Sequence, residues 1–318
     1  MIKIGSSVIP TKYILAPMAG CTDLPFRLIA REHGAKFCFF EMVDCNSITY
    51  GQTRRVLSIL KTHEDDTPIA AQLLGRDPEK MLDGAKFILK HTKISFIDIN
   101  AACPAKKVIK KKSGSYLLND ELELCKIIKK LSGSLDVPVT VKIRAGYEEI
   151  DKIRISHLAK KCEKSGAQAI FIHGRTKDQG YAGGIDYASI KAVKESVNIP
   201  VVGSGNIFST QLADQMMSET GCDGVLVARG ALGNPWIFAE SGESSEDKNS
   251  TFSARKNVLK KHLEYIDKYN NPGPNGNAGC MRKIVIWYVK GFPMARRARE
   301  KVSLVNSYEK MLKLIDSL

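Results

Sequence analysis

Long uncharged apolar segments are absent from this 318-residue sequence, and so is an apolar segment near its beginning. Apolar runs such as 137–141 and 167–172 fall far short of the roughly 20 residues that a membrane span requires. Residues 1–5 lack the apolar core that a secretory signal contains. We therefore expect a soluble protein that has no membrane partner.

Paired cysteines are also absent, because no C-x-x-C pattern occurs among the eight cysteines. Zinc sites of the ribbon kind need such pairs, so the pattern predicts no metal. Unpaired thiols are typical of a reducing compartment, which makes the cytoplasm the expected location. The cysteines are Cys21, Cys38, Cys45, Cys103, Cys125, Cys162, Cys222 and Cys280.

The composition is that of a globular chain with an excess of positive charge. A hydrophobic share of 43% and a charged share of 26% exclude a disordered chain, a collagen-like fibre and a coiled coil. The net charge is +14, and residues 250–318, with 14 basic and 5 acidic side chains, hold +9 of it. This distribution predicts a tail domain that faces nucleic acid; a general preference for lysine is the alternative.

Short apolar or β-branched runs alternate with segments of helical periodicity through about 230 residues. Eight such repeats predict an α/β fold, a (β/α)8 TIM barrel, and an open doubly wound sheet is the alternative. Gly34, Gly166 and Gly221 each precede a strand, where a left-handed helix end is expected. The predicted strands are 13–17, 36–42, 68–73, 95–100, 137–144, 168–173, 199–204 and 223–228, and the clearest helices are 78–90, 121–131, 153–165 and 211–219.

The ends of the predicted strands favour the barrel. Nearly every strand has an apolar interior and finishes in a polar residue or a glycine. Because function gathers at the carboxyl ends of TIM-barrel strands, these residues predict a binding site for a polar, anionic ligand. They include Gln72, Asn100, Lys142, His173 and Ser204.

The composition changes after residue 239. Residues 240–253 are polar and serine-rich, and they predict a linker between a barrel domain, 1–239, and a small basic helical domain, 254–318. In the second domain we expect helices over 254–269 and 282–308, separated by a loop over 270–279. Trp287 and Tyr288 are expected in its core.

Two turns with glycine follow the seventh and eighth predicted strands, Ser204-Gly205-Asn206 and Ala228-Arg229-Gly230. Backbone N–H groups can approach a phosphate at such turns, and Arg229 adds charge; ordinary loop turns are the alternative. Lys142 either meets the polar edge of a flavin or extends from the barrel rim into water. Gln72 likewise either pairs with a heteroaromatic ring or caps its strand.

His173 with Arg175 suits phosphate or base recognition, and a structural histidine is the alternative. Cys103 lies in a loop just past the fourth predicted strand, and Pro104 stiffens that loop. A thiol that is protonated at neutral pH can serve as a proton donor. An inert buried cysteine is the alternative, which the place of Cys103 at the rim disfavours.

Together these segments resemble the tRNA-dihydrouridine synthase family, over nearly the whole chain. Each segment alone is a modest match, but their order at successive strand ends is highly specific. Arg282-Lys283 and residues 287–291 are similar to the bacterial B-type subgroup. The other matching segments are 15–23, 71–75, 98–104, 141–144, 173–176, 181–183 and 228–231.

The resemblance implies an oxidoreductase that reduces a tRNA uridine to 5,6-dihydrouridine, with flavin mononucleotide (FMN) in the barrel mouth and NADPH (or NADH) as reductant. We expect the protein to be a monomer. It implies hydride transfer from reduced FMN to C6 and proton transfer from Cys103 to C5. The implied FMN-binding residues are Ala16, Pro17, Met18, Gln72, Lys142, His173, Ser204, Gly205, Asn206, Ala228 and Arg229. The implied contacts with the uridine or the tRNA backbone are Asn100, His173 and Arg175. In the basic domain, the candidates for a tRNA phosphate surface are Arg282, Lys283, Arg296, Arg297 and Arg299.

Two positions depart from the family pattern. Ala102 stands where glycine is usual, which costs about 1 kcal/mol if the position needs a positive φ. Ser204-Gly205-Asn206 replaces Asn-Gly-Asp, which weakens the prediction for those side chains more than for the backbone. The competing interpretations are an FMN barrel that reduces a free pyrimidine, as dihydroorotate dehydrogenases do, and a non-catalytic RNA-binding barrel.

Overall fold

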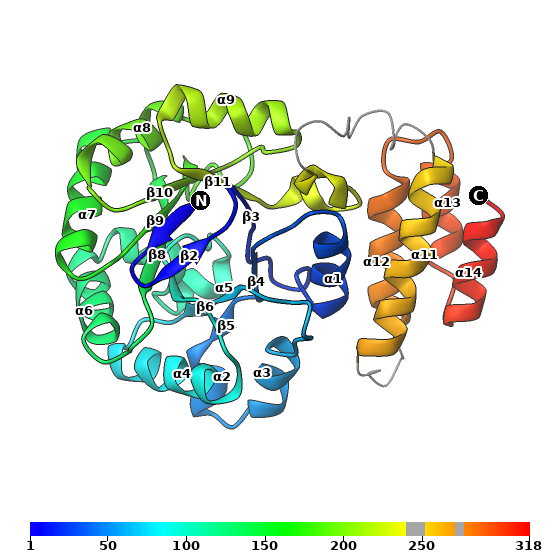
Figure 1. Ribbon diagram of the computed structural model, residues 1–318, viewed down its shortest axis with the longest axis horizontal. Coiled ribbons are helices and arrows are strands. Elements are labelled where there is room, and N and C mark those ends of the chain that lie inside the picture. The colour runs from blue at the N-terminus through cyan, green and yellow to red at the C-terminus, as the bar shows by residue number, and fades with distance from the viewer. Residues whose placement is uncertain (240–251, 271–276) are drawn as a thin grey trace. The chain divides into compact units, whose positions relative to one another are not determined.

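A computed structural model describes residues 1–239, 252–270 and 277–318. Its central feature is a closed parallel barrel, shown in Figure 1. Closure follows from the pairing, because the first barrel strand, β3, bonds to β4 on one side and to the last strand, β11, on the other. The predicted (β/α)8 barrel is therefore confirmed, and the open sheet is excluded. The barrel strands are β3 (Tyr13–Leu15), β4 (Cys38–Phe39), β5 (Val43–Asp44), β6 (Ile69–Leu74), β7 (Ile97–Asn100), β8 (Val139–Gly146), β9 (Ile170–Thr176), β10 (Val201–Ser204) and β11 (Gly224–Val227).

The second barrel strand is divided into two short pieces. Both β4 and β5 pair with β6, Cys38 with Ile69 and Val43 with Leu73. Five residue steps on the divided strand thus face four on β6, so one extra residue is accommodated between the pieces, as in a β-bulge. This irregular stretch carries Glu41 and Met42.

The helices of the barrel begin at polar caps. Asp77 caps α4 by accepting hydrogen bonds from the N–H groups of Glu79 and Lys80, and aspartates or a serine cap α6 to α9 in the same way. Gly34, Gly166 and Gly221 have the expected positive φ. The helices are α2 (Cys45–Thr49), α3 (Thr53–Ile59), α4 (Pro78–His91), α5 (Lys106–Lys110), the 3-10 helix η1 (Gly114–Leu118), α6 (Glu121–Ser132), α7 (Lys152–Lys164), α8 (Tyr187–Ser196) and α9 (Thr210–Thr220).

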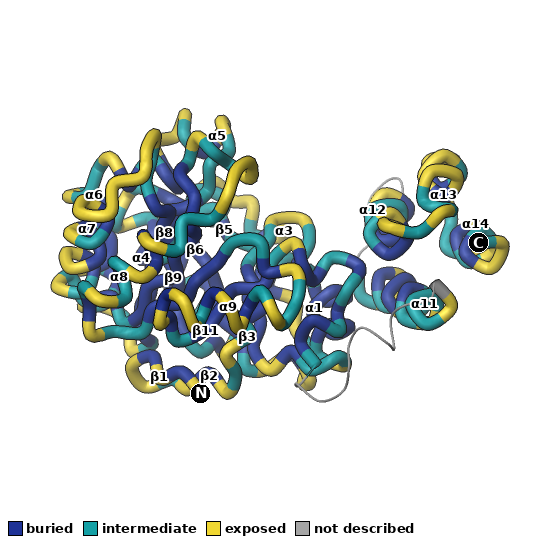
Figure 2. The backbone as a smooth tube through the Cα atoms, turned by 90° about the horizontal axis from the view of Figure 1, so that it is seen from above, coloured by how far each residue is buried: buried dark blue, intermediate teal, exposed yellow. Residues whose placement is uncertain are grey.

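The amino-terminal end of the barrel is filled with apolar side chains. A hairpin that the sequence patterns did not predict, β1 (Ile2–Ile4) with β2 (Ser7–Ile9), contributes three isoleucines to this core, as the buried segments in Figure 2 illustrate. Phe37 and Phe96 stack there with their ring centroids 5.5 Å apart. Because this end is packed with apolar groups, polar ligands have access only from the opposite, carboxyl end of the strands.

The described residues group into two compact units, Met1–Thr22 with Lys36–Ala228 and Asp23–Ala35 with Arg229–Leu318. The second unit thus includes α1 (Leu24–Glu32), whose Phe26 ring lies 6.0 Å from the ring of Trp287. The domain boundary expected at residue 239 stays a prediction, and most of the predicted linker, 240–251, lies outside the described residues. The other elements of this unit are the 3-10 helices η2 (Arg229–Ala231) and η3 (Pro235–Phe238) and the helices α11 (Phe252–Tyr269), α12 (Ala278–Val289), α13 (Ala295–Val302) and α14 (Tyr308–Asp316).

The expected single helix over 282–308 is wrong, because α12 ends at Val289 and α13 begins at Ala295. Gly291 between them has φ +91°, a conformation outside the helical region, and Pro293 cannot donate a helical hydrogen bond. Tyr288 is buried in the apolar core of this unit and Trp287 packs against that core, as expected. Most of the predicted loop, 271–276, lies outside the described residues. No helix in the described part of the chain has the length and apolar character needed to cross a membrane.

Candidate active site

The carboxyl-terminal halves of the barrel strands bring the predicted polar residues to one end of the barrel. Asn100 on β7 pairs in register with Lys142 on β8, and Ser204 on β10 pairs with His173 on β9. Ala16, just past β3, donates its N–H to the carbonyl of Val227 on β11, at 2.9 Å. The rim therefore gathers residues from strands that are distant in sequence. The predicted residues that it brings together are Ala16, Gln72, Asn100, Lys142, His173, Ser204 and Ala228, with Pro17 and Met18 following Ala16 in the chain.

Beneath this rim, a fully buried carboxylate, Asp98, organises the polar groups. It accepts a 2.7 Å hydrogen bond from Nε2 of Gln72 and another, also 2.7 Å, from the hydroxyl of Thr140. Burial raises the pKa of Asp98 to about 6, while the bonds from Gln72 and Thr140 and the charge of Lys142 act in the opposite direction. Asp98 is thus ionised at neutral pH, and it orients the Gln72 amide with its nitrogen toward the carboxylate.

Lys142 provides positive charge at the same level. Loss of water around it, and secondarily the charge of Arg144, lower the pKa of Lys142 to about 8, although Asp98 and Cys103 raise it. The side chain is half-buried and still carries its charge at neutral pH. An ammonium group that has lost part of its hydration shell is well suited to an electron-rich ligand at the rim.

The Cys103 loop is held by Asn100. Its Oδ1 accepts hydrogen bonds from the N–H groups of Ala102 and Cys103, at 3.0 and 2.9 Å. Its Nδ2 donates to Oε1 of Gln72 at 2.7 Å and contacts the sulfur of Met42 at 3.5 Å. These partners occupy the amide of Asn100, so the geometry favours a role in positioning the loop; its contact with tRNA stays a prediction.

A second set of bonds fixes Cys103 from the other side. The carbonyl oxygen of Cys103 accepts bonds from the N–H and the hydroxyl of Ser115, at 3.1 and 3.0 Å. Cys103 is half-buried and forms no disulfide. A proton donor is therefore presented at the rim on a fixed backbone.

The adjacent Gly114 leaves room for this arrangement. It has φ +63°, and a Cβ there would lie only 2.8 Å from the carbonyl oxygen of Cys103.

We expect Gly114→Ala to cost about 1–3 kcal/mol of folding free energy more than Gly221→Ala, because only the first substitution adds a clash to the positive-φ strain. Gly221 has φ +69° and nothing near its Cβ position. Denaturant unfolding of both variants measures the difference, and the alkylation rate of Cys103 reports whether its loop has moved. Equal losses in the two variants would contradict the packing argument.

Arg144 was not singled out from the sequence, yet it links the Cys103 loop to the loop after β9. Its guanidinium donates to the carbonyls of Ala102, Thr176 and Gly180, at 2.7, 2.8 and 3.0 Å. The only sequence indication was its place in the segment 141–144. Burial lowers the pKa of Arg144 from its usual range.

Arg175 is buried rather than exposed to a phosphate. Its guanidinium donates to the carbonyls of Ala182 and Gly183 and to Oδ1 of Asn206, the last at 3.2 Å. These bonds tie the loop after β9 to the turn after β10. The geometry therefore favours a positioning role for Arg175, and the predicted tRNA contact is not tested.

The turn after β10 depends on backbone conformation. Gly205 has φ +128°, and a Cβ there would lie 2.4 Å from Ile185 and 3.1 Å from the His173 ring. Asn206 has φ +54°, which asparagine tolerates. Ala102, in contrast, is not among the described residues with positive φ, so alanine carries no conformational cost at that position.

The remaining predicted residues lie in the second unit. Arg229 begins η2, directly after Ala228 in the chain. On α12, Arg282 donates to the carbonyl of Val305 at 2.8 Å, and the ammonium of Lys283 lies 5.2 Å from the Trp287 ring centroid. Both side chains are half-buried. They therefore contribute to the packing of this unit, and their contact with tRNA stays a prediction.

Comparison with known proteins places these residues in a family context. The family model described as dihydrouridine synthase matches residues 14–317. The chain is 36% identical over 319 residues to tRNA-dihydrouridine synthase B of Xanthomonas axonopodis, a match that covers 98% of this chain and 94% of that protein. It is also 36% identical over 310 residues to a probable tRNA-dihydrouridine synthase of Rickettsia conorii, covering 96% of this chain and 92% of that protein.

Solved structures support the fold. Histamine dehydrogenase from Rhizobium sp. 4-9 matches with a TM-score of 0.59 at 13% identity, covering 83% of this chain and 50% of that one. Morphinone reductase matches with a TM-score of 0.53 at 14% identity, covering 74% of this chain and 87% of that one. At these identities the similarity concerns the barrel alone.

Proposed function

The chain belongs to the dihydrouridine synthase family, and we propose that it reduces a uridine in tRNA to 5,6-dihydrouridine with FMN as cofactor and NADPH, or NADH, as reductant. It is accordingly an oxidoreductase. The observation that carries the proposal is a thiol, Cys103, held on a fixed backbone at the barrel rim to which Gln72, Asn100 and Lys142 also belong.

The residues at the rim fit a flavin. Oε1 of Gln72 accepts from Asn100, and one N–H of its Nε2 donates to Asp98, so the remaining N–H could donate to an acceptor on the edge of the flavin ring. Lys142 supplies a positive charge beside it. At Gly205 the chain makes a tight turn without a side chain, a geometry that suits close approach of a phosphate. We assign His173, Ser204, Ala228 and the segment 16–18 to the same site.

When bound, FMN supplies the hydride that C6 of the uracil receives. The Cys103 thiol donates its proton to C5, which completes the addition of two hydrogens across the C5–C6 bond. Asn100 and Ser115 keep Cys103 in place during this transfer. Lys142, whose charge interacts with Cys103, stabilises the thiolate that remains until solvent returns a proton.

The target base has to leave its stack to reach this rim. Extrusion costs a few kcal/mol and less in a loop than in a duplex, so an unpaired uridine is the expected substrate. The predicted cytoplasmic location and monomeric state are part of the same proposal.

The proposal is tested with the purified full-length protein. We expect the protein to show the absorbance spectrum of a flavin. When it is incubated with NADPH and bulk tRNA from cells that lack this protein, we expect dihydrouridine to form in the tRNA. Protein that binds no FMN after reconstitution would overturn the proposal. So would reduction of a free pyrimidine such as orotate with none in tRNA, which is the outcome expected of a dihydroorotate-dehydrogenase-like barrel.

A further inference from the structure

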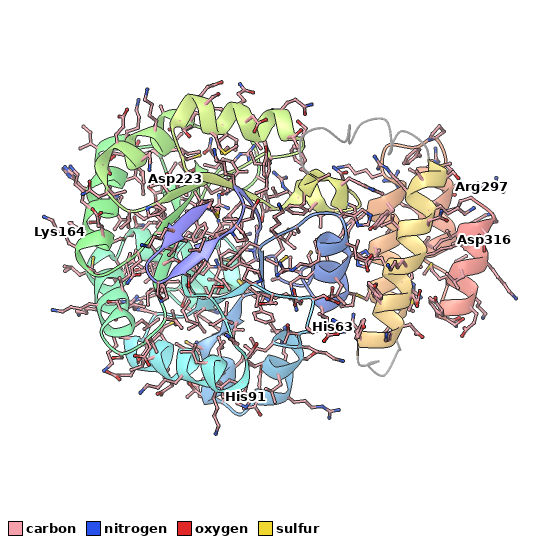
Figure 3. All side chains as sticks on the ribbon, in the orientation of Figure 1. His63, His91, Lys164, Asp223, Arg297 and Asp316 are labelled. Carbon is pink, nitrogen blue, oxygen red and sulfur yellow. The ribbon has the colours of Figure 1, made fainter. Side chains whose placement is uncertain are left out.

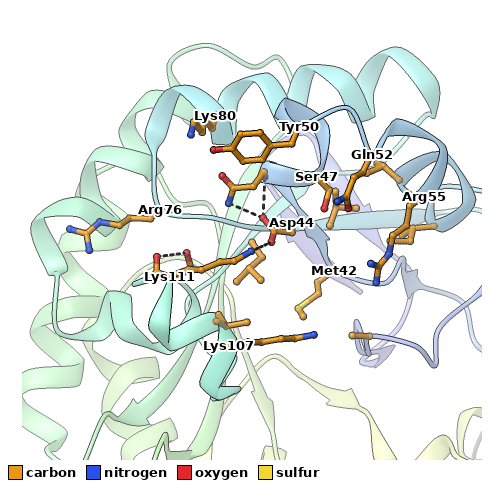
Figure 4. A pocket seen from close by; sticks show the side chains of 18 of the residues that line it. Met42, Asp44, Ser47, Tyr50, Gln52, Arg55, Arg76, Lys80, Lys107 and Lys111 are labelled. Atoms are coloured by element: carbon orange, nitrogen blue, oxygen red, sulfur yellow. Dashed lines mark hydrogen bonds and ion pairs between the residues drawn. The ribbon is translucent and has the colours of Figure 1, made fainter.

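A large cavity lies beside the predicted active site within the barrel unit (Figure 4). Its volume is about 820 Å³, within the range of ligand-binding pockets. The walls come from the second barrel strand, α2, α3, the start of α4, and α5. None of the residues predicted from the sequence to bind FMN or tRNA lines it. Its apolar lining consists of Met42, Val43, Val56, Ile59, Leu74 and Val108, with Ala19 at one edge.

The cavity adjoins the proton donor. Met42 in its wall contacts Asn100, whose Oδ1 holds the N–H of Cys103. Lys107 and Val108 belong to α5, which begins three residues after Cys103. A ligand in the cavity would therefore lie one layer of side chains from the reacting base.

Charges of both signs line the cavity, with five basic side chains against four carboxylates. The basic ones are Arg55, Arg76, Lys80, Lys107 and Lys111, and the acidic ones are Glu41, Asp44, Asp77 and Glu123. Within the described residues, no carboxylate pairs with Arg55 on α3 or Lys107 on α5, and Figure 4 shows both directed toward the hollow beside Met42. Two other cations in the wall are engaged, Arg76 with Asp120 at 2.6 Å and Lys111 with Asp44 at 3.2 Å. Arg55 and Lys107 thus remain available to a phosphate.

An exposed aromatic ring lies at the same cavity. Tyr50, at the end of α2, is 71% exposed, and the ammonium of Lys80 lies 5.6 Å from its ring centroid. Burial of apolar surface would normally hide such a ring. An aromatic face near cations and an apolar floor is the combination with which proteins bind unpaired nucleotides.

We propose that this cavity binds the tRNA nucleotide next to the reduced uridine, with its base against Tyr50 and its phosphate between Arg55 and Lys107. The proposal rests on the proposed function, because a uridine at Cys103 is joined by phosphodiester bonds to neighbours that must lie nearby. A dinucleotide reductant also carries a base and phosphates, and the experiment distinguishes it.

The test compares affinities of full-length variants for bulk tRNA from cells that lack this protein. We expect Tyr50→Ala to weaken tRNA binding about tenfold, and the double variant Arg55→Ala with Lys107→Ala to do the same. Tyr50→Phe retains the aromatic face, so its tRNA affinity should stay near that of the unaltered protein. The control is Lys160→Ala with Lys164→Ala, which removes the same charge from α7 (Lys164 is labelled in Figure 3). A photoreactive benzoylphenylalanine in place of Tyr50 should crosslink to a nucleotide adjacent to the reduced uridine.

Unchanged tRNA affinity, or a loss no larger than that of the control pair, overturns the proposal. NADPH oxidation can also be measured without tRNA, with an artificial electron acceptor. If the cavity variants raise the KM for NADPH in that assay and leave the tRNA affinity unchanged, the cavity binds the reductant, and the proposal is overturned. If the unaltered protein binds tRNA but forms no dihydrouridine, the proposed function fails while the affinities still decide the cavity.

Discussion

Replacing Cys103 with alanine is expected to lower the rate of dihydrouridine formation by about 10²- to 10⁴-fold, the usual contribution of a general acid. The substitution removes the proton donor but leaves Gln72, Lys142 and Asp98 in place, since none of their side-chain hydrogen bonds involves the thiol. FMN content and NADPH oxidation should therefore stay near those of the unaltered protein. The measurement is single-turnover formation of dihydrouridine in tRNA by the pre-reduced enzyme.

The matched control for this prediction is Cys125→Ala. Cys125 is also half-buried and forms no disulfide, but it lies on α6, an outer helix of the barrel. Its replacement should leave the rate unchanged. An unaltered rate in Cys103→Ala would remove this thiol from the mechanism, and a simultaneous loss of FMN would indicate a structural defect of the rim instead.

Removing three arginines from α13 is expected to weaken tRNA binding by tenfold or more. Arg296, Arg297 and Arg299 are exposed, and Arg296 pairs only at the surface, with Glu300 at 3.4 Å (Arg297 is labelled in Figure 3). If all three contact phosphates, their replacement by alanine should reduce the slope of log K against log salt by about 2–3, since each contact contributes roughly 0.7–0.9. Filter binding or anisotropy at several salt concentrations measures this slope.

The control is a triple variant of the barrel, Lys152→Ala with Lys160→Ala and Lys164→Ala on α7, which removes the same three positive charges as the α13 variant. A slope change of the same size in both variants would mean that overall charge, and not α13, determines the affinity. Substitution is a cleaner experiment than deletion of residues 250–318. Deletion would also uncover α1, because Phe26 packs against His262 and Trp287 of the deleted segment.

Much of the barrel could be predicted because its strands are buried on both faces. A strand such as β6, in which all six residues are buried, leaves an apolar run in the sequence that only Gln72 interrupts. The helices between strands were likewise visible from their periodicity and from glycines at their ends. Elements without such a pattern were missed. The strands of the β1–β2 hairpin have three residues each, too few to show an alternation.

The sequence by itself determined the family, the barrel and the residue types at its rim, because these depend on local motifs and apolar patterns. Only the tertiary structure decided which hydrogen-bond partners position the residues at the rim. Asp98 and Gln72 are 26 residues apart and Arg144 and Ala102 are 42 apart, yet each pair is hydrogen-bonded. The same holds for the cavity, which Tyr50 after α2, Arg55 on α3 and Lys107 on α5 line together. Partners of this kind are chosen by strand pairing and packing, which bring distant residues together and leave no pattern in any one segment.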